Sequence, residues 1–240
     1  MIAVGSALFP QSSRALLRVG VSGHRVPPKL PHESEAPIRA LVDRILAAAV
    51  TAADAEASAK AAAGAFAVVS SIAEGADRIV AAAGLAAGFD LYVVLPLPRA
   101  EYARDFESPQ SRAAFEALLA KATAVVEIGG TAEDRPQAYE AAGFAMLANS
   151  DLLIAIWDGE GAAGVGGTAE IVSRAIADGI PVVWIEPIHP HTMQLARPGG
   201  ALAAATPQAA FATADMPAVA AAVRAAAQRR IHSNDEAHQR

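Results

Sequence analysis

The sequence predicts an α/β protein in which helices cover both faces of a mainly parallel sheet of about six or seven strands. Six short, almost continuous apolar runs recur along the chain, as expected for strands buried on both faces. Segments with helical character lie between these runs, which is the alternation that builds a parallel sheet. The length of 240 residues is enough for one large domain with its own core.

The apolar runs place strands at residues 16–22, 66–72, 91–95, 124–128, 152–157 and 182–186. After the first, apolar residues from Ile38 to Val50 recur at helical spacing and predict a long helix that packs one stripe on the sheet. A second helix is expected to follow the segment 73–78 and to end at about residue 88. Further helices are expected at 111–122, 136–147, 168–178 and 217–230.

We expect a single α/β domain over residues 15–230, preceded by an N-terminal extension at 1–14. Its core spans 16–186. The segment 187–216 loses periodicity and is predicted to be irregular. The C-terminal helix at 217–230 is followed by a polar, flexible tail at 231–240.

Composition excludes several classes of function. The formal net charge is −6 and no run of lysine or arginine is present, so we expect no nucleic-acid partner. The absence of cysteine excludes disulfides and thiolate metal sites. No stretch of about 20 uncharged apolar residues and no signal peptide is visible, so we expect a cytoplasmic protein without a membrane partner. The histidines at 189 and 191 read as loop residues, and we expect neither a metal nor a cofactor.

Three glycine-bearing segments follow predicted strands and are the candidates for a ligand site. They are residues 20–25 (GVSGHR), 74–78 (EGADR) and 164–170 (GVGGTAE). Glycine lets the backbone approach a phosphate, and a helix that begins after such a loop presents free N–H groups to an anion. Ligands of open parallel sheets bind at the carboxyl ends of the strands. None of the three segments is a standard nucleotide fingerprint, and the second strand does not end in the acidic residue that holds an NAD ribose.

These segments, together with LPLPRAEYARDF at 95–106 and WDG at 157–159, resemble the SLOG superfamily, in particular a bacterial branch of it. That group contains the LOG phosphoribohydrolases and DNA-processing protein A. The resemblance spans roughly residues 16–186 and implies a three-layer Rossmann-like fold. It also implies a nucleoside-phosphate or ADP-ribose-type ligand. LOG enzymes carry a catalytic glutamate three residues after a threonine, whereas here Glu170 stands two residues after Thr168.

Each candidate residue has a functional and a structural interpretation. Glu170 is the catalytic candidate. Alternatively, it is a structural residue whose carboxylate is stabilised by the dipole at the start of its helix and pairs with Arg174. Arg25 and Arg78 could hold a phosphate, or could cap loops. The other candidate ligand-binding residues are Gly20, Ser22, Gly23, His24, Glu74, Gly75, Asp77, Asp158, Gly166, Gly167 and Thr168.

Among these, Glu74 and Asp77 are candidates for ribose hydroxyls, and Asp77 could equally stabilise the start of its helix. His24 could be an acid/base or a loop hydrogen-bonding residue. The polar segment from Tyr102 to Phe106 could form a lid over the ligand or pack on the surface.

Three hypotheses of function follow. The first is a sensor or binding protein for a nucleotide-like small molecule. The second is an N-glycoside hydrolase that uses Glu170 on a nucleoside monophosphate. The third is a structural or partner-binding module without a ligand. Because the chain carries no obvious effector, any output would need a homo-oligomer or a separate effector protein.

Overall fold

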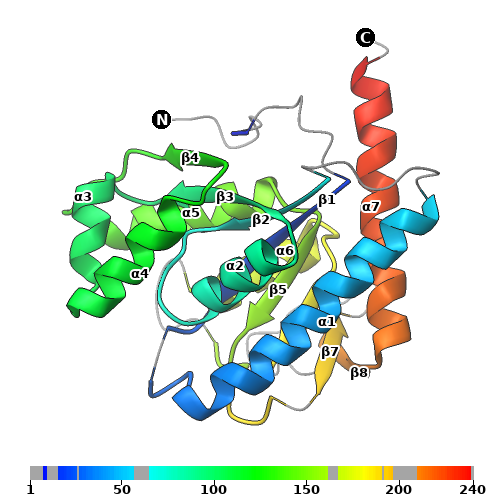
Figure 1. Cartoon of the computed structure of the whole chain (residues 1–240), viewed down its shortest axis with the longest axis horizontal. Helices are drawn as coiled ribbons and strands as arrows, with labels where there is room; N and C mark the ends of the chain where they lie inside the picture. Colours follow the sequence, from blue (N-terminus) through cyan, green and yellow to red (C-terminus); the bar gives the residue numbers. More distant parts are fainter. Residues whose placement is uncertain are drawn as a thin grey trace.

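A single eight-stranded sheet organises the computed structural model (Figure 1), which describes residues 8–9, 16–25, 27–56, 65–161, 167–190, 192–196 and 210–238. The strand order is β4-β3-β2-β1-β5-β6-β7-β8. The strands are β1 (Leu17–Gly23), β2 (Phe66–Ser70), β3 (Asp90–Leu95), β4 (Ala124–Glu127), β5 (Leu152–Ile156), β6 (Val182–Ile185), β7 (Met193–Ala196) and β8 (Phe211–Ala214). The helices are α1 (His32–Glu56), α2 (Ala76–Ala86), α3 (Arg99–Tyr102), the 3-10 turn η1 (Ala103–Asp105), α4 (Pro109–Leu119), α5 (Arg135–Ala148), α6 (Thr168–Ala177) and α7 (Met216–His238).

The six strands predicted from the apolar runs are confirmed, and they pair in parallel from β4 to β6. The segment 187–216, predicted to be irregular, instead contributes two strands. β7 pairs antiparallel with β6, and β8 pairs antiparallel with β7. Both strands have only four residues and lie at the end of the sheet, where a strand is partly exposed and needs no long apolar run.

Helices cover both faces of the sheet, which confirms the predicted three-layer fold. One layer contains α1, α2, α4 and α7, and Figure 1 shows α1 and α7 crossing side by side on this face. The opposite layer contains α5 and α6. Alternate residues of β1, such as Leu17 and Val19, pack into the first layer, whereas Ala67 and Val69 of β2 pack into the second. Apolar side chains therefore cover both faces of the central strands.

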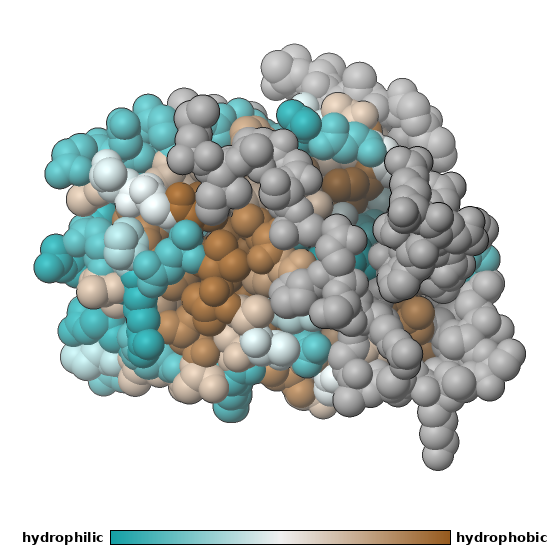
Figure 2. Space-filling view, turned by 90° about the horizontal axis from the view of Figure 1, so that it is seen from above, coloured by the Kyte–Doolittle hydropathy of each residue, from teal (hydrophilic) through white to brown (hydrophobic). Residues whose placement is uncertain are grey.

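The surface seen from above has one area where apolar residues gather, bordered by hydrophilic residues on one side (Figure 2). In the described part, the large apolar side chains that are exposed are Val125 of β4 and Ile188, which follows β6. None of the described helices is long and apolar enough to cross a membrane.

The order of the strands positions the site. From β1 the chain moves outward through β2 and β3 to β4, then returns to place β5 on the other side of β1. The loops after β1 and β5 therefore diverge in opposite directions, and this switch point opens a crevice at the carboxyl ends of the two strands.

Candidate functional site

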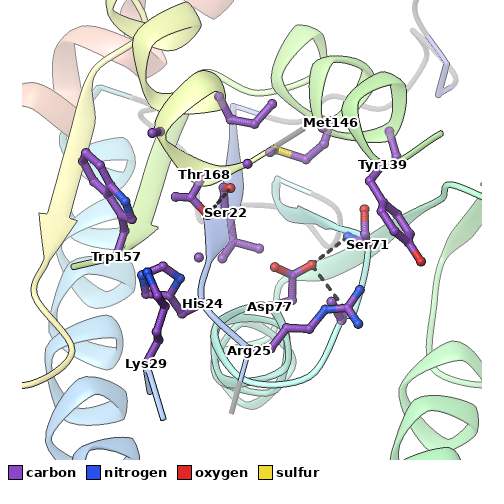
Figure 3. Close-up of a pocket in the computed structure, with 18 of the residues that line it drawn as sticks. Ser22, His24, Arg25, Lys29, Ser71, Asp77, Tyr139, Met146, Trp157 and Thr168 are labelled. Carbon is purple, nitrogen blue, oxygen red and sulfur yellow. Dashed lines mark hydrogen bonds between the residues drawn. The ribbon is translucent and has the colours of Figure 1, made fainter. Parts of the chain in front are cut away.

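A cavity of about 510 Å³ opens at this switch point (Figure 3). Its volume lies in the range typical of small-molecule sites. Four of the residues that line it come from the end of β1 and the loop that follows, namely Ser22, Gly23, His24 and Arg25. Four more of the predicted residues reach it from other elements, namely Asp77, Asp158, Gly167 and Thr168. The structure therefore brings together residues from all three glycine-bearing segments.

The carboxylate of Asp77 is fixed at the base of the cavity. Its Oδ2 accepts hydrogen bonds from the Ser70 hydroxyl at 3.0 Å and from the backbone N–H groups of Ser71 at 3.1 Å and Ala73 at 3.4 Å. The Ser70 hydroxyl in turn accepts a hydrogen bond from the backbone N–H of Ile72. The first turn of α2 is thereby tied to the loop that leaves β2.

Burial dominates the electrostatics of Asp77. It raises the pKa of the carboxyl from 3.8 to about 6, against the opposing effects of the hydrogen bonds from Ser70, Ala73 and Ser71 and of the nearby Arg25 charge. A carboxyl with this pKa is mostly ionised at neutral pH and gains a proton in mildly acidic solution. Such a group suits either hydroxyl recognition or proton transfer.

Arg25 supplies a positive charge beside Asp77. Its guanidinium lies over the ring of Tyr139, with 5.7 Å between its Cζ and the ring centroid, and its Nη2 is 3.8 Å from Asp105 Oδ2. Asp105 also accepts a hydrogen bond from the Tyr139 hydroxyl and pairs with Arg135. Because the Arg25 side chain is 43% exposed and its contact with Asp105 is long, the guanidinium is available to an anion.

A second charged group lines the opposite side of the cavity. Asp158, just beyond β5, lies 2.9 Å from His24 Nε2 and accepts a hydrogen bond of 2.7 Å from Lys29 Nζ. Lys29 also pairs with Glu160 at 2.9 Å. Burial acts to raise the pKa of Asp158, but the hydrogen bonds from Lys29, the Glu160 N–H and His24 outweigh it and hold this pKa below its usual value. Asp158 is therefore ionised at neutral pH.

The N-terminus of α6 points at the cavity. Gly167 is the N-cap residue, and its carbonyl accepts the first hydrogen bonds of the helix from Glu170 and Ile171. The Ser22 hydroxyl lies 3.4 Å from the Thr168 hydroxyl, as Figure 3 shows, so β1 and α6 meet at this point. The first N–H groups of a ten-residue helix and its dipole favour an anion here.

Apolar side chains from α5 and from the residue that follows β5 form part of the wall, including Met146, Ala142 and Trp157. Two glycines permit this packing. A Cβ on Gly20 would lie 2.6 Å from Met146 Sδ and 2.4 Å from Ser150 Oγ, and a Cβ on Gly143 would lie 2.6 Å from Ile171 Cδ1. Gly20, predicted as a ligand-binding residue, is buried inside β1 and contacts the helix beneath the cavity.

Other predicted residues lie outside this cavity. Glu74, Gly75 and Arg78 line a second cavity of about 670 Å³ between α1, α2 and α4. Arg78 donates to the Ile72 carbonyl at 3.1 Å and to the Ser111 hydroxyl at 2.8 Å, and its guanidinium stacks on Phe106. Arg78 thus serves to join α2 to α4 in this structure.

Glu170, the predicted catalytic residue, does not line the cavity of Figure 3. It lies on α6 against Glu140 of α5, and the hydrogen bond between the two carboxyls raises the pKa of Glu140. Gly166 lies outside the described residues, as does position 191. His189 contacts Glu186 in its own loop.

The segment predicted as a lid, Tyr102 to Phe106, lies beside the cavity and is fixed by contacts with its neighbours. Tyr102 is buried and lines the cavity, and Phe106 packs with it and with Phe115. Asp105 is bound to α5 through Arg135 and Tyr139, and the exposed Arg104 pairs only with Glu101 in the described part.

Sequence reasoning missed Lys29, Ser71 and Tyr139, which all line the cavity. Ser71 lies near the carboxyl end of the strand predicted at 66–72, where ligands of parallel sheets bind, and this position could have indicated it. Lys29 lies in a proline-rich loop and Tyr139 on a helix, and neither belongs to a motif. Only the tertiary fold brings them to the site.

Comparison with solved structures shows a likeness of fold to DNA processing protein A. The protein from Streptococcus pneumoniae is 15% identical, with a TM-score of 0.48 over 71% of this chain and 50% of that one. The protein from Helicobacter pylori is 16% identical, with a TM-score of 0.47 over 78% of each chain. The aligned part is therefore half the length of the Streptococcus protein. DNA-processing protein A is a member of the group that the sequence motifs resemble, and the likeness found here is one of fold alone.

No protein-family model matches the chain, and no curated protein matches it.

The prediction that nucleic acid is excluded as a partner is corrected. The Helicobacter structure describes a single-stranded DNA binding mode of its own protein. The prediction relied on the net charge of −6, which sums over the whole surface. Binding depends instead on local charge, and the cavity carries Arg25 and Lys29 near its opening.

Proposed function

We propose that this chain binds a nucleotide or a nucleotide-derived small molecule, such as a nucleoside monophosphate or an ADP-ribose-type compound, as a sensor or binding protein. The observation that carries the proposal is one cavity in which the N-terminus of α6, the Arg25 guanidinium and the Asp77 carboxylate converge. An anion-favouring helix end and a hydroxyl-accepting carboxylate are the two groups that a sugar phosphate requires.

In this proposal the phosphate lies against Gly167 and Thr168, where helix N–H groups and the helix dipole stabilise negative charge. Arg25 supplies a charge-assisted hydrogen bond to the same ligand. The apolar wall at Met146 and Trp157 provides a surface for a base or another flat group. Lys29, which is 46% exposed, adds a second positive charge to the lining of the cavity and pairs there with Asp158.

The hydrolase that uses Glu170 receives no support from this geometry, because Glu170 faces Glu140 and not the cavity. Binding is therefore the function that we propose. A cytoplasmic location, and signalling through a homo-oligomer or a separate effector, stay predictions.

Thermal unfolding with a ligand panel tests the proposal. The panel contains AMP, ADP-ribose, cyclic ADP-ribose and NAD, together with a single-stranded oligonucleotide. A ligand that binds only the folded state at about 100 times its dissociation constant adds roughly 2.7 kcal/mol of stability. We expect at least one small molecule of the panel to raise Tm in the wild type. The shift should be reduced in Arg25→Ala.

No shift with any small molecule at millimolar concentration would contradict the proposal. A shift with the oligonucleotide alone would also contradict it and would show that the chain binds nucleic acid instead.

A further inference from the structure

One of the two acidic residues predicted to bind ribose hydroxyls, Asp77, reaches the end of the second strand from the following helix. In dinucleotide-binding α/β sheets, an acidic residue at the end of the second strand accepts hydrogen bonds from ribose hydroxyls. Here β2 ends at Ser70, which is not acidic. Asp77 of α2 nevertheless brings its carboxylate back to that strand end, where it bonds to Ser70, Ser71 and Ala73.

The two oxygens of Asp77 have different surroundings. Oδ2 accepts all three of the hydrogen bonds from Ser70, Ser71 and Ala73. In the described part of the chain, Oδ1 accepts none. Asp77 is only 8% exposed, and it lines the cavity, as Figure 3 shows. Oδ1 is not among the fully buried polar atoms that lack a partner, so it can be reached from the cavity and is a position for a donor that a ligand supplies.

The surroundings favour a neutral hydroxyl as that donor. Arg25 already balances the charge of Asp77, and a phosphate would be repelled by the carboxylate. The hydroxyl of Tyr102, which lines the same cavity, has no hydrogen bond to any described residue and can accept or donate. A sugar hydroxyl can donate to Asp77 while it accepts from Tyr102.

We propose that Asp77 Oδ1 accepts a hydrogen bond from a ribose hydroxyl, so that the cavity selects ribose-bearing ligands over their deoxyribose counterparts. This inference rests on the proposed function and names the ligand class within it. A site built to bond a hydroxyl discriminates against the analogue that lacks it, because its own polar group is then left unpaired.

Isothermal titration with matched ligands tests this directly. AMP and ADP-ribose are each compared with their 2′-deoxy and 3′-deoxy forms at pH 8. A charge-assisted hydrogen bond predicts that removal of the recognised hydroxyl weakens binding roughly ten- to a hundredfold. In Asp77→Asn, the ribose form should lose affinity while the deoxy form changes little, which leaves a preference within about threefold. Damage to the fold would instead weaken both forms.

Glu74→Gln is the matched control. It makes the same carboxyl-to-amide change three residues earlier but faces the second cavity, so the ribose preference should persist.

The wild type alone provides a second test, since the preference should shrink between pH 8 and pH 5 as Asp77 gains a proton. The groups that face Asp77 are Arg25 of the β1 loop, Tyr102 of α3 and Arg78 of its own helix, and none of them changes charge in this range. The ligand phosphate affects both forms of a ligand alike and cancels in the ratio.

Equal affinity of ribose and deoxyribose forms in the wild type would overturn the inference and leave the proposed function standing. Absence of binding by every small molecule of the panel would instead remove the proposed function, and this inference with it. A ribose preference that survives in Asp77→Asn would assign the recognition to another residue and would also overturn the inference.

Discussion

The backbone N–H of Ser71 donates a hydrogen bond of 3.1 Å to Oδ2 of Asp77, although Ser71 lies just beyond β2 and Asp77 lies inside α2. This contact closes the loop between the strand and the helix and holds the carboxylate at the base of the cavity. It also explains how an acidic group reaches the end of a strand whose own last residue is serine.

Asp77 should impose a pH dependence on folding. Its pKa in the folded chain is about 6, above its value of 3.8 when unperturbed. Between these pH values the folded state binds more protons than the unfolded state, so stability falls as pH rises from about 4 to 6. A shift of this size corresponds to about 3 kcal/mol. Urea unfolding of the wild type and Asp77→Asn at pH 4 and pH 7 measures it.

The difference in unfolding free energy between the two proteins isolates Asp77, because all other titrating groups are common to both. We expect the variant to lose less stability than the wild type on going from pH 4 to pH 7. Parallel pH profiles would show that Asp77 titrates normally.

Arg25→Ala should weaken ligand binding without large loss of stability. The side chain is 43% exposed, its contact with Asp105 is 3.8 Å long and its other contact is with the half-buried Tyr139, so the fold depends little on it. Loss of a charge-assisted hydrogen bond to phosphate predicts an affinity roughly ten- to a hundredfold lower. Titration calorimetry with the best panel ligand measures it. Arg104→Ala, an exposed arginine on η1 outside the cavity, is the control and should bind normally.

Arg78→Ala should lower stability and leave ligand binding intact, which is the reverse of the result expected for Arg25→Ala. Its guanidinium joins the Ile72 carbonyl to the Ser111 hydroxyl and lies 4.4 Å from the ring centroid of Phe106. We expect a loss of about 1–3 kcal/mol in unfolding free energy, because a buried carbonyl loses its donor. Affinity for the ligand should stay within about twofold. A large loss of affinity with stability unchanged would place Arg78 in the binding site.

Gly20→Ala should destabilise the sheet. The added Cβ would lie 2.4 Å from Ser150 Oγ and 2.6 Å from Met146 Sδ, so the interior must rearrange. Overpacking of this kind costs about 1–3 kcal/mol, which chemical denaturation can measure. The double variant Gly20→Ala with Ser150→Ala removes the nearer clash and should recover part of the stability. Equal stabilities of Gly20→Ala and wild type would mean that the strand and α5 are less closely packed than described.

Glu170→Gln should leave ligand affinity unchanged within about twofold, since Glu170 does not line the cavity. The same variant also tests the hydrolase hypothesis. Release of a free base from AMP by the wild type, lost in this variant, would show that Glu170 is catalytic after all.

The fold could be predicted largely from the sequence because its strands are buried on both faces and appear as apolar runs. β7 and β8 could not, since their sequences, MQLA and FATA, mix polar residues and alanine with single large apolar residues and form no such run. The convergence of the loops after β1 and before α6 also follows from general rules, because a switch point gathers the carboxyl ends of strands.

Neighbouring residues of one motif proved to have different surroundings. Asp77 and Arg78 are adjacent on α2, where consecutive side chains point about 100° apart. Asp77 therefore faces the cavity and Arg78 faces α4. Sequence spacing alone could not decide this, because it depends on where α2 begins. Tyr139 contacts Asp105, 34 residues earlier, and Arg25 of the β1 loop, and no local pattern indicates either contact.

A crystal structure of the chain with the best ligand of the panel tests the central claim most directly. The account predicts that the ligand lies in the cavity at the carboxyl ends of β1 and β5. An anionic group should lie within hydrogen-bonding distance of Thr168 and Arg25, and a sugar hydroxyl within hydrogen-bonding distance of Asp77 Oδ1. A ligand bound instead in the second cavity, against Glu74 and Arg78, would contradict it.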